Sequence, residues 1–274
     1  MMAEALVAGL RPRLPHLRLH VFDVSEKRTR IFAQRFDATS HDCVKSCIDG
    51  ADAIVLATKP QNLGSLAPQL RDRIDEKSLV ISILAGTTID TLKVALGHAR
   101  VVRSIPNICA AVHQGMTVWS SAETTSEVDR GLAATILSAF GEELRVNDEK
   151  YLDIATSLSG SGPAYILLMM EAMIDTSVHM GLPRELATKI TSHAIHGTAV
   201  YAKTGLEGCA MSVASLRADI TSPGGTTASA LYKLKEGRFE TTLADGMWAA
   251  YKRSVDLGRG IDGKDSRSGC KEPG

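Results

Sequence analysis

The stretch Leu79-Val-Ile-Ser-Ile-Leu-Ala-Gly-Thr-Thr88 decides the fold of this 274-residue chain. Its apolar first half predicts a buried strand, and the periodic run at residues 89–96 predicts the helix that follows. Nearly continuous apolar strands that alternate with helices are typical of a parallel sheet covered on both faces, so we expect an α/β domain over residues 1–147. Further strands of this domain are predicted at residues 17–22, 53–57, 101–105, 116–120 and 142–146.

Polar or glycine-rich residues follow the predicted strands in the same way each time. The strand ends read Asp23-Val-Ser25, Thr58-Lys-Pro60, Ala85-Gly-Thr87 and Pro106-Asn107. Because ligands of parallel sheets bind at the carboxyl ends of the strands, these positions predict a dinucleotide site.

Asp23 bears on which dinucleotide that is. An acid at the end of the second strand can hydrogen-bond the adenosine ribose hydroxyls, which favours NAD. Ser25, Lys27 and Arg28 follow at once and could instead hold the 2′-phosphate of NADP. Asp23 could equally be a turn residue before a helix, so the preference between NADH and NADPH stays open.

After Val146 the pattern becomes all-helical. Apolar residues recur at helical spacing on broad faces, which suggests more burial than one monomer offers and predicts an oligomer through residues 148–257. From Gly258 the chain lacks periodicity, so we expect a disordered tail over residues 258–274. Helices are expected at residues 151–158, 164–180, 184–203, 211–217, 228–235 and 240–257.

The stretch Asp219-Ile-Thr-Ser-Pro-Gly-Gly-Thr-Thr227 links two of these helices. Ser222 suits an N-cap and Pro223 a first helical position, and the two glycines leave backbone N–H groups uncovered. This combination predicts either a plain capped helix or a cradle for a small carboxylate, with two threonine hydroxyls beside it.

Composition excludes several function classes. Lys+Arg and Asp+Glu are equal at 31 each and aromatic residues are only 4%, so nothing indicates a nucleic-acid partner or an anionic membrane. None of the five cysteines forms a C-x-x-C pair, and we interpret Cys43 and Cys47 as small apolar fillers in a reducing compartment. No metal site is expected, and the absence of a signal-peptide pattern favours a cytoplasmic protein, with organelle import left open.

Five motifs stand in a fixed order and spacing along the chain. They are Ala57-Thr-Lys-Pro60, Ala85-Gly-Thr-Thr-Ile89, Arg103-Ser-Ile-Pro-Asn107, Leu158-Ser-Gly-Ser-Gly-Pro-Ala-Tyr165 and Asp219-Ile-Thr-Ser-Pro-Gly-Gly-Thr-Thr227. Together they resemble the pyrroline-5-carboxylate reductase family. The resemblance implies an N-terminal Rossmann-like dinucleotide-binding domain, a C-terminal all-α dimerisation domain and reduction of 1-pyrroline-5-carboxylate to L-proline with NADPH or NADH. Its partners would be this small substrate and further copies of the chain, in a homodimer or a larger oligomer.

The resemblance also implies roles for particular residues. Thr227 would be catalytic, its hydroxyl meeting the ring nitrogen, and Glu149 would belong to the substrate site. The loop that holds the substrate carboxylate would consist of Ser222, Gly224, Gly225 and Thr226. With the strand ends, the expected coenzyme-binding residues are Met2, Ala3, Asp23, Ser25, Ala57, Thr58, Lys59, Pro60, Ala85, Gly86, Asn107 and Asp219.

One departure from the family concerns the first residues. Relatives begin with a β-strand and a Gly-x-Gly-x-Met-Ala loop, whereas this chain starts at the Met2-Ala3 of that motif. We therefore expect an incomplete copy in which the first strand and the Gly-rich loop are missing, neighbouring strands lose ladder partners and the pyrophosphate lacks its glycine turn. Two rival hypotheses remain: a non-catalytic oligomerisation partner, and another two-domain reductase acting on a hydroxy or keto acid.

Overall fold

The computed structural model describes residues 2–208 and 211–261, and it divides into two compact units. The first, which we call the sheet unit, comprises Met1–Ser161 with Ala249–Gly274, and the second, the helical unit, comprises Gly162–Trp248. This division differs from the expected boundary after residue 147. The difference arises because helix α7 (Lys150–Ala155) packs its buried Leu152 against strands of the sheet.

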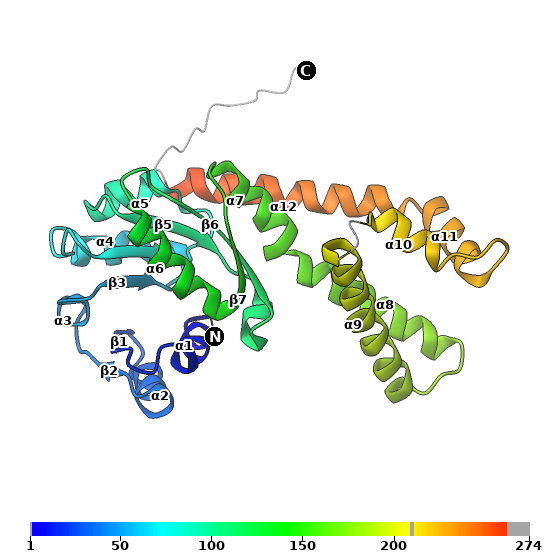
Figure 1. The fold of residues 1–274 in the computed structure, drawn as a ribbon, viewed down its shortest axis with the longest axis horizontal. Coiled ribbons are helices and arrows are strands. Elements are labelled where there is room, and N and C mark those ends of the chain that lie inside the picture. Colours follow the sequence, from blue (N-terminus) through cyan, green and yellow to red (C-terminus); the bar gives the residue numbers. More distant parts are fainter. Residues whose placement is uncertain (1, 209–210, 262–274) are drawn as a thin grey trace, which may run out of the picture. The chain divides into compact units, whose positions relative to one another are not determined.

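Five strands form the main sheet, in the order β3-β4-β5-β6-β7 (Figure 1). The first three run parallel, as expected, but β6 is antiparallel to β5, and β7 is parallel to β6. Only a short 3-10 turn, Ile108–Val112, connects β5 to β6, whereas a parallel crossover needs about a dozen residues or more. The strand bounds are Ala53–Leu56, Leu79–Ser82, Val101–Ile105, Gly115–Ser121 and Gly141–Arg145.

Two short strands form a separate parallel pair, β1 (His20–Val21) with β2 (Thr39–Ser40). Neither of them pairs with β3. The strand expected at residues 17–22 is correspondingly reduced to two residues. Helix α2 (Glu26–Phe36) connects the pair, and its Phe32 and Phe36 pack beside Val7 of α1 (Met2–Arg13).

Helices cover both faces of the main sheet. On one face α1 and α6 (Glu127–Leu137) pack against Ile81 and Trp119. On the other face α3 (Val44–Ile48), α4 (Leu63–Leu70) and α5 (Ile89–Leu96) pack against Val80. Neighbouring residues of β4 thus point into opposite cores, as the pleat of a strand requires. Helix α1 continues through Pro12 to Arg13.

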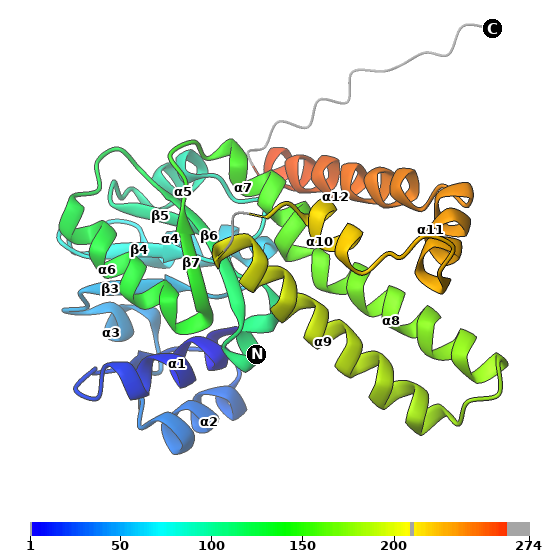
Figure 2. The ribbon, with the colours of Figure 1, turned by 45° about the vertical axis from the view of Figure 1, so that its right-hand side comes forward.

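Helices alone build the helical unit (Figure 2). In it α8 and α9 form a hairpin, closed at Gly181 with φ +102°. Helix α12 runs to Ile261, so the disordered tail expected from residue 258 is wrong at its start, and its remainder lies outside the described residues. No helix in the described part of the chain is long and apolar enough to span a membrane. The helices are α8 (Gly162–His179), α9 (Arg184–Gly208), α10 (Val213–Asp219), α11 (Thr226–Glu236) and α12 (Phe239–Ile261).

Apolar side chains of the helical unit are mostly exposed. Helix α8 contains no buried residue although its sequence is strongly apolar, and among the described residues of the unit only Ala187 and Leu216 are buried hydrophobics. Leu216 closes the α9–α10 contact, where it lies against Gly205. Apolar surface of this extent on one protein typically marks an interface.

Candidate functional site

The carboxyl ends of β3 and β4 carry the predicted coenzyme loops of the sheet unit. Ala57, Thr58 and Lys59 are exposed directly after β3, and a 3-10 turn begins at Pro60. Ala85 is exposed after β4. These backbone segments are accessible to a ligand at the edge where parallel α/β sheets bind one.

Gly86 belongs to the second of these loops, Ala85-Gly-Thr-Thr88, which we call the coenzyme loop. Its φ of +73° suits glycine, and a Cβ there would lie 2.9 Å from Leu257 Cβ of α12. Conversely, a Cβ on Gly258 would lie 2.7 Å from the Gly86 carbonyl oxygen. The end of α12 therefore packs directly on the coenzyme loop, and only Ala85 remains open to solvent.

Two buried polar atoms at the strand ends have no hydrogen-bond partner among the described residues. They are the Thr87 hydroxyl of the coenzyme loop and the Asn107 Oδ1 atom after β5. The Asn107 amide nitrogen donates to Ser159 Oγ at 3.0 Å, in a single π-helical turn (Thr156–Gly160). Buried polar groups are normally satisfied, so these two fit a polar ligand at this edge, such as a nicotinamide coenzyme.

Asp23 and Ser25 lie after β1 and are engaged in a local turn. The backbone N–H of Ser25 donates to Asp23 Oδ1 at 2.8 Å, and Arg28 Nη1 lies 3.8 Å from Asp23 Oδ2. Ser25 occupies the N-cap position of α2 but makes no side-chain cap. The turn role is thus observed, and contact of either residue with coenzyme stays a prediction.

Met2 and Ala3 form the first turn of α1 and are half-buried against apolar clusters of the sheet unit. Asp219 is the last residue of α10 and is exposed. Coenzyme contact at these three positions stays a prediction as well.

Glu149 takes part in a buried network of the sheet unit. Its Oε1 atom accepts from the Ile89 backbone N–H at 2.8 Å and from Arg103 Nη1 at 2.8 Å. Arg103 is 1% exposed, and its Nη2 donates to Asp153 Oδ1 at 2.9 Å. The Ser254 hydroxyl of α12 donates to the same Asp153 oxygen at 2.9 Å. Glu149 therefore binds protein groups here, and its predicted contact with substrate stays untested.

The predicted substrate loop of the helical unit is a tight turn before α11. The Gly225 N–H donates to the Ser222 carbonyl at 3.1 Å, and Gly224 has φ +71°, the signature of a type II turn with Pro223 at its second position. The helix begins at Thr226 with Gly225 as N-cap. The expectation of Ser222 as N-cap and Pro223 as first helical residue is wrong, because the turn places both outside the helix.

The turn determines which backbone N–H groups remain free to bind an anion. The N–H of Gly225 is already used within the turn, whereas helix geometry leaves the first N–H groups of α11, from Thr226 onward, without a helical partner. No side chain caps them. The hydroxyl of Ser222 lies within 2.4 Å of where a Gly225 Cβ would stand, so a side chain at position 225 would require this hydroxyl to move. Thr227 is half-buried beside these donors.

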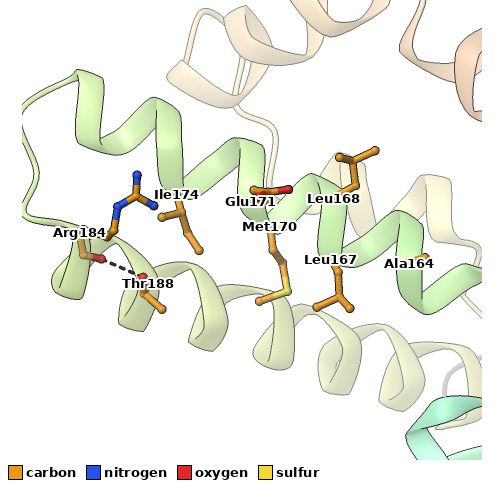
Figure 3. Close-up of a pocket in the computed structure, with 8 residues that line it drawn as sticks. All are labelled: Ala164, Leu167, Leu168, Met170, Glu171, Ile174, Arg184 and Thr188. Carbon is orange, nitrogen blue, oxygen red and sulfur yellow. Dashed lines mark hydrogen bonds between the residues drawn. The ribbon is translucent and has the colours of Figure 1, made fainter.

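Two open grooves hollow the surface of the helical unit. A groove of about 570 Å³ lies between α8 and α9, where Leu167, Met170 and Ile174 meet Arg184 and Thr188 (Figure 3). A second, of about 430 Å³, lies between α10 and α11 next to the substrate loop and includes Arg217, Thr221, Ala228 and Tyr232. The first is lined mainly by apolar side chains, so it is suited to another protein surface.

Sequence reasoning missed Arg103, Asp153 and Ser159 as individual site residues. Arg103 was visible as a charged residue inside an otherwise apolar strand, and such a residue must find buried partners. No comparable signal marked Asp153, because its partners lie 50 and 101 positions away in sequence.

Comparison with known proteins agrees with this arrangement. The family model described as pyrroline-5-carboxylate reductase dimerisation matches residues 149–257, and the model described as NADP oxidoreductase coenzyme F420-dependent matches residues 1–86. A pyrroline-5-carboxylate reductase of Arabidopsis thaliana is 36% identical over 88% of this chain and 83% of its own length. The corresponding protein of Pseudomonas aeruginosa is 33% identical over 93% of each chain.

Solved structures give the same result. A pyrroline-5-carboxylate reductase from Coxiella burnetii has a TM-score of 0.83 at 31% identity and covers 93% of this chain and 94% of its own. The Plasmodium falciparum pyrroline carboxylate reductase, solved with NADP bound, has a TM-score of 0.78 at 28% identity over 94% of each chain. Because sequence and structural similarity extend over most of its length, the chain belongs to the pyrroline-5-carboxylate reductase family.

Proposed function

We propose that this chain reduces 1-pyrroline-5-carboxylate to L-proline with NADPH or NADH. The observation that carries the proposal is the N-terminus of α11, where uncapped backbone donors stand beside the Thr227 hydroxyl. A carboxylate accepts hydrogen bonds from such donors and is favoured by the helix dipole. Family relatives named for this reaction supply the second support.

The substrate carboxylate binds the free N–H groups at the start of α11, with the Ser222 hydroxyl as a further donor. This contact fixes the ring, and the Thr227 hydroxyl hydrogen-bonds the imine nitrogen next to it. When bound, a reduced nicotinamide coenzyme would supply a hydride to the C=N carbon, and the protonated nitrogen held by Thr227 would take the π-bond electrons and become the amine of proline. The protein's own contribution is therefore to orient the ring and to steady the nitrogen.

At the sheet unit, exposed backbone after β3 and β4 and the unpartnered atoms of Thr87 and Asn107 would hold the coenzyme. Their chemistry fits, since amide and hydroxyl groups complement the carboxamide and ribose of a nicotinamide nucleotide.

We infer that the working form is a homodimer through the helical unit. The match to a dimerisation family supports oligomer formation, and the unburied apolar residues of α8 give it a physical reason. A second copy would cover these side chains and provide burial that the single unit lacks.

The test is the loss of NADPH or NADH absorbance with pyrroline-5-carboxylate as substrate. Thr227→Ala is expected to lower turnover by roughly tenfold or more, because one polar contact to the reacting nitrogen contributes ~1–3 kcal/mol. Thr198→Ala is the matched control, since its hydroxyl only bonds the Ala194 carbonyl within α9. Unchanged kinetics in Thr227→Ala would remove this residue from the mechanism.

Coenzyme oxidation must also depend on the substrate. If the wild-type protein forms the dimer and binds coenzyme but does not oxidise it with pyrroline-5-carboxylate, the proposed reaction is wrong. A protein that dimerises without binding coenzyme would instead be a non-catalytic partner.

A further inference from the structure

We propose that Arg103 and Glu149 are positioning residues for the coenzyme loop, and that Glu149 acts there rather than on the substrate. The inference rests on the proposed function, because it assigns the loop after β4 to the coenzyme. Its structural basis lies wholly within the sheet unit, in a chain of hydrogen bonds from α12 to the start of α5.

The first step is the attachment of the coenzyme loop to α5. The loop ends at Thr88, the N-cap of α5, whose side chain accepts from the Thr91 N–H. The N–H of the next residue, Ile89, has no carbonyl partner within the helix. It donates a hydrogen bond to Glu149 Oε1 at 2.8 Å. A carboxylate at this point also faces the positive end of the helix dipole. Glu149 thus fixes the residue at which the loop becomes a helix.

The second step is the dependence of Glu149 on Arg103. The guanidinium is buried and bridges Glu149, the N-cap of α7, and Asp153 in the first turn of the same helix. Its Nε atom has no hydrogen-bond partner among the described residues, so the hydrogen bonding and charge pairing of the guanidinium depend on these two carboxylates. A buried arginine with two carboxylate partners is held in one orientation, since rotation would leave charges unpaired.

The third step concerns the other side of the loop. Ser254 of α12 binds Asp153 from the same network, and one turn later Leu257 and Gly258 pack on Gly86. The network therefore holds α12 in the position in which its last turns contact the coenzyme loop. Both flanks of the loop, Gly86 and Ile89, are held by groups that connect through Arg103.

The fourth step separates this role from substrate binding. Both hydrogen bonds described for Glu149 use its Oε1 atom, and the carboxylate is 29% exposed. If Glu149 positions the loop, its loss changes coenzyme affinity first. If it binds the substrate, its loss changes the substrate KM at saturating coenzyme. The two roles therefore predict changes in different constants, namely the coenzyme dissociation constant or the substrate KM.

The experiment compares Glu149→Ala and Glu149→Gln with wild type in the full chain. Dissociation constants for NADPH are measured by fluorescence of the bound nicotinamide, and KM for pyrroline-5-carboxylate is measured at saturating NADPH. We expect Glu149→Ala to raise the NADPH dissociation constant about tenfold and to change the substrate KM by less than about twofold. Glu149→Gln keeps an acceptor for Ile89 and is expected to recover most of the affinity.

Asp90→Ala is the matched control, because Asp90 is an acid in the same first turn of α5 but is 92% exposed and pairs only loosely with Lys93. It should leave both constants near wild type. Gly258→Ala probes the other flank, where the added methyl group meets the Gly86 carbonyl, and should also raise the NADPH dissociation constant.

Hydrogen exchange without coenzyme gives an independent readout. Amides of residues 86–92 should exchange faster in Glu149→Ala than in wild type, while those of β6 should not change. Equal NADPH dissociation constants in wild type and Glu149→Ala, no NADPH binding by wild type, or a raised substrate KM alone would overturn the inference. Wild type that binds NADPH but does not reduce pyrroline-5-carboxylate would refute the proposed reaction while this comparison still stands.

Discussion

The sheet unit and the helical unit differ in how many of their large apolar side chains each buries within itself. The sheet unit buries Trp119, Phe140 and Leu79 in cores of its own, and the buried guanidinium of Arg103 is paired with two carboxylates. The helical unit buries almost none of its large apolar side chains among the described residues. The comparison teaches that the predicted coenzyme edge is organised within one chain, whereas the helices that carry the predicted substrate loop leave apolar side chains open to another surface.

The largest expected effect comes from disrupting the contact between the exposed apolar side chains of α8 and a second copy of the chain. The double variant Leu167→Glu/Leu168→Glu places two charges among the exposed apolar side chains of α8, on different sides of the helix (Figure 3). Because burying an unpaired charge is costly, the dimer dissociation constant should rise by about 100-fold or more. Sedimentation velocity over a concentration series measures it.

The control is Val94→Glu/Val128→Glu, which puts the same charges on exposed valines of the sheet unit. It should leave the dimer intact. If the α8 variant dimerises with normal affinity, the dimer contact lies on another part of the helical unit.

A smaller effect is expected from a contact internal to the sheet unit. Asp129 caps α6 with Ser126 and pairs with Arg100, and hydrogen bonds from the Arg100 side chain hold the pKa of Asp129 below its usual range. Asp129→Asn should lower the free energy of unfolding by about 2 kcal/mol at neutral pH.

The pH dependence of that effect follows from the direction of the shift. A carboxyl whose folded-state pKa is lowered contributes stability fully above its unfolded value, and the contribution is lost as pH falls through the folded value. The gap between wild type and Asp129→Asn should therefore close as the pH falls below about 4. In a Trp248→Phe background the fluorescence of buried Trp119 reports the sheet unit alone. A gap that does not narrow as the pH is lowered from 5 to 3 would contradict this assignment.

The smallest effect separates two thiols within one short helix of the sheet unit. Cys43 is exposed, and a hydrogen bond with the Ser46 side chain lowers its pKa. Burial raises the pKa of Cys47 to about 11. At pH 8 iodoacetamide should modify Cys43 at least about tenfold faster than Cys47, because the thiolate is the reactive form. Peptide mapping after timed quenching measures both, and equal rates would show that α3 opens readily.

Local signals predicted much of the fold. The helix at residues 89–96 and the strand at 101–105 have the bounds that the sequence predicted, since a threonine N-cap and a continuous apolar run mark them. The direction of β6 was not predictable, because pairing direction depends on the connection and on distant strands. Helix α1 includes Pro12, because a proline near the last turn disturbs few helical hydrogen bonds.

The site was predicted in part. The substrate loop and the strand ends were located by turn residues, but the use of the Gly225 N–H inside the turn depends on φ at Gly224 and is invisible in sequence. The Arg103 network joins β5, α7, α5 and α12, and it appears only when the chain is folded. Residue types indicate which groups need partners, whereas tertiary structure decides which partners they find.

The separation of β1 and β2 from the main sheet leaves strand β3 at its margin. In the described chain, the backbone donors and acceptors of Ala53–Leu56 on the side turned away from β4 have no neighbouring strand, so open hydrogen-bonding groups border the sheet on that side.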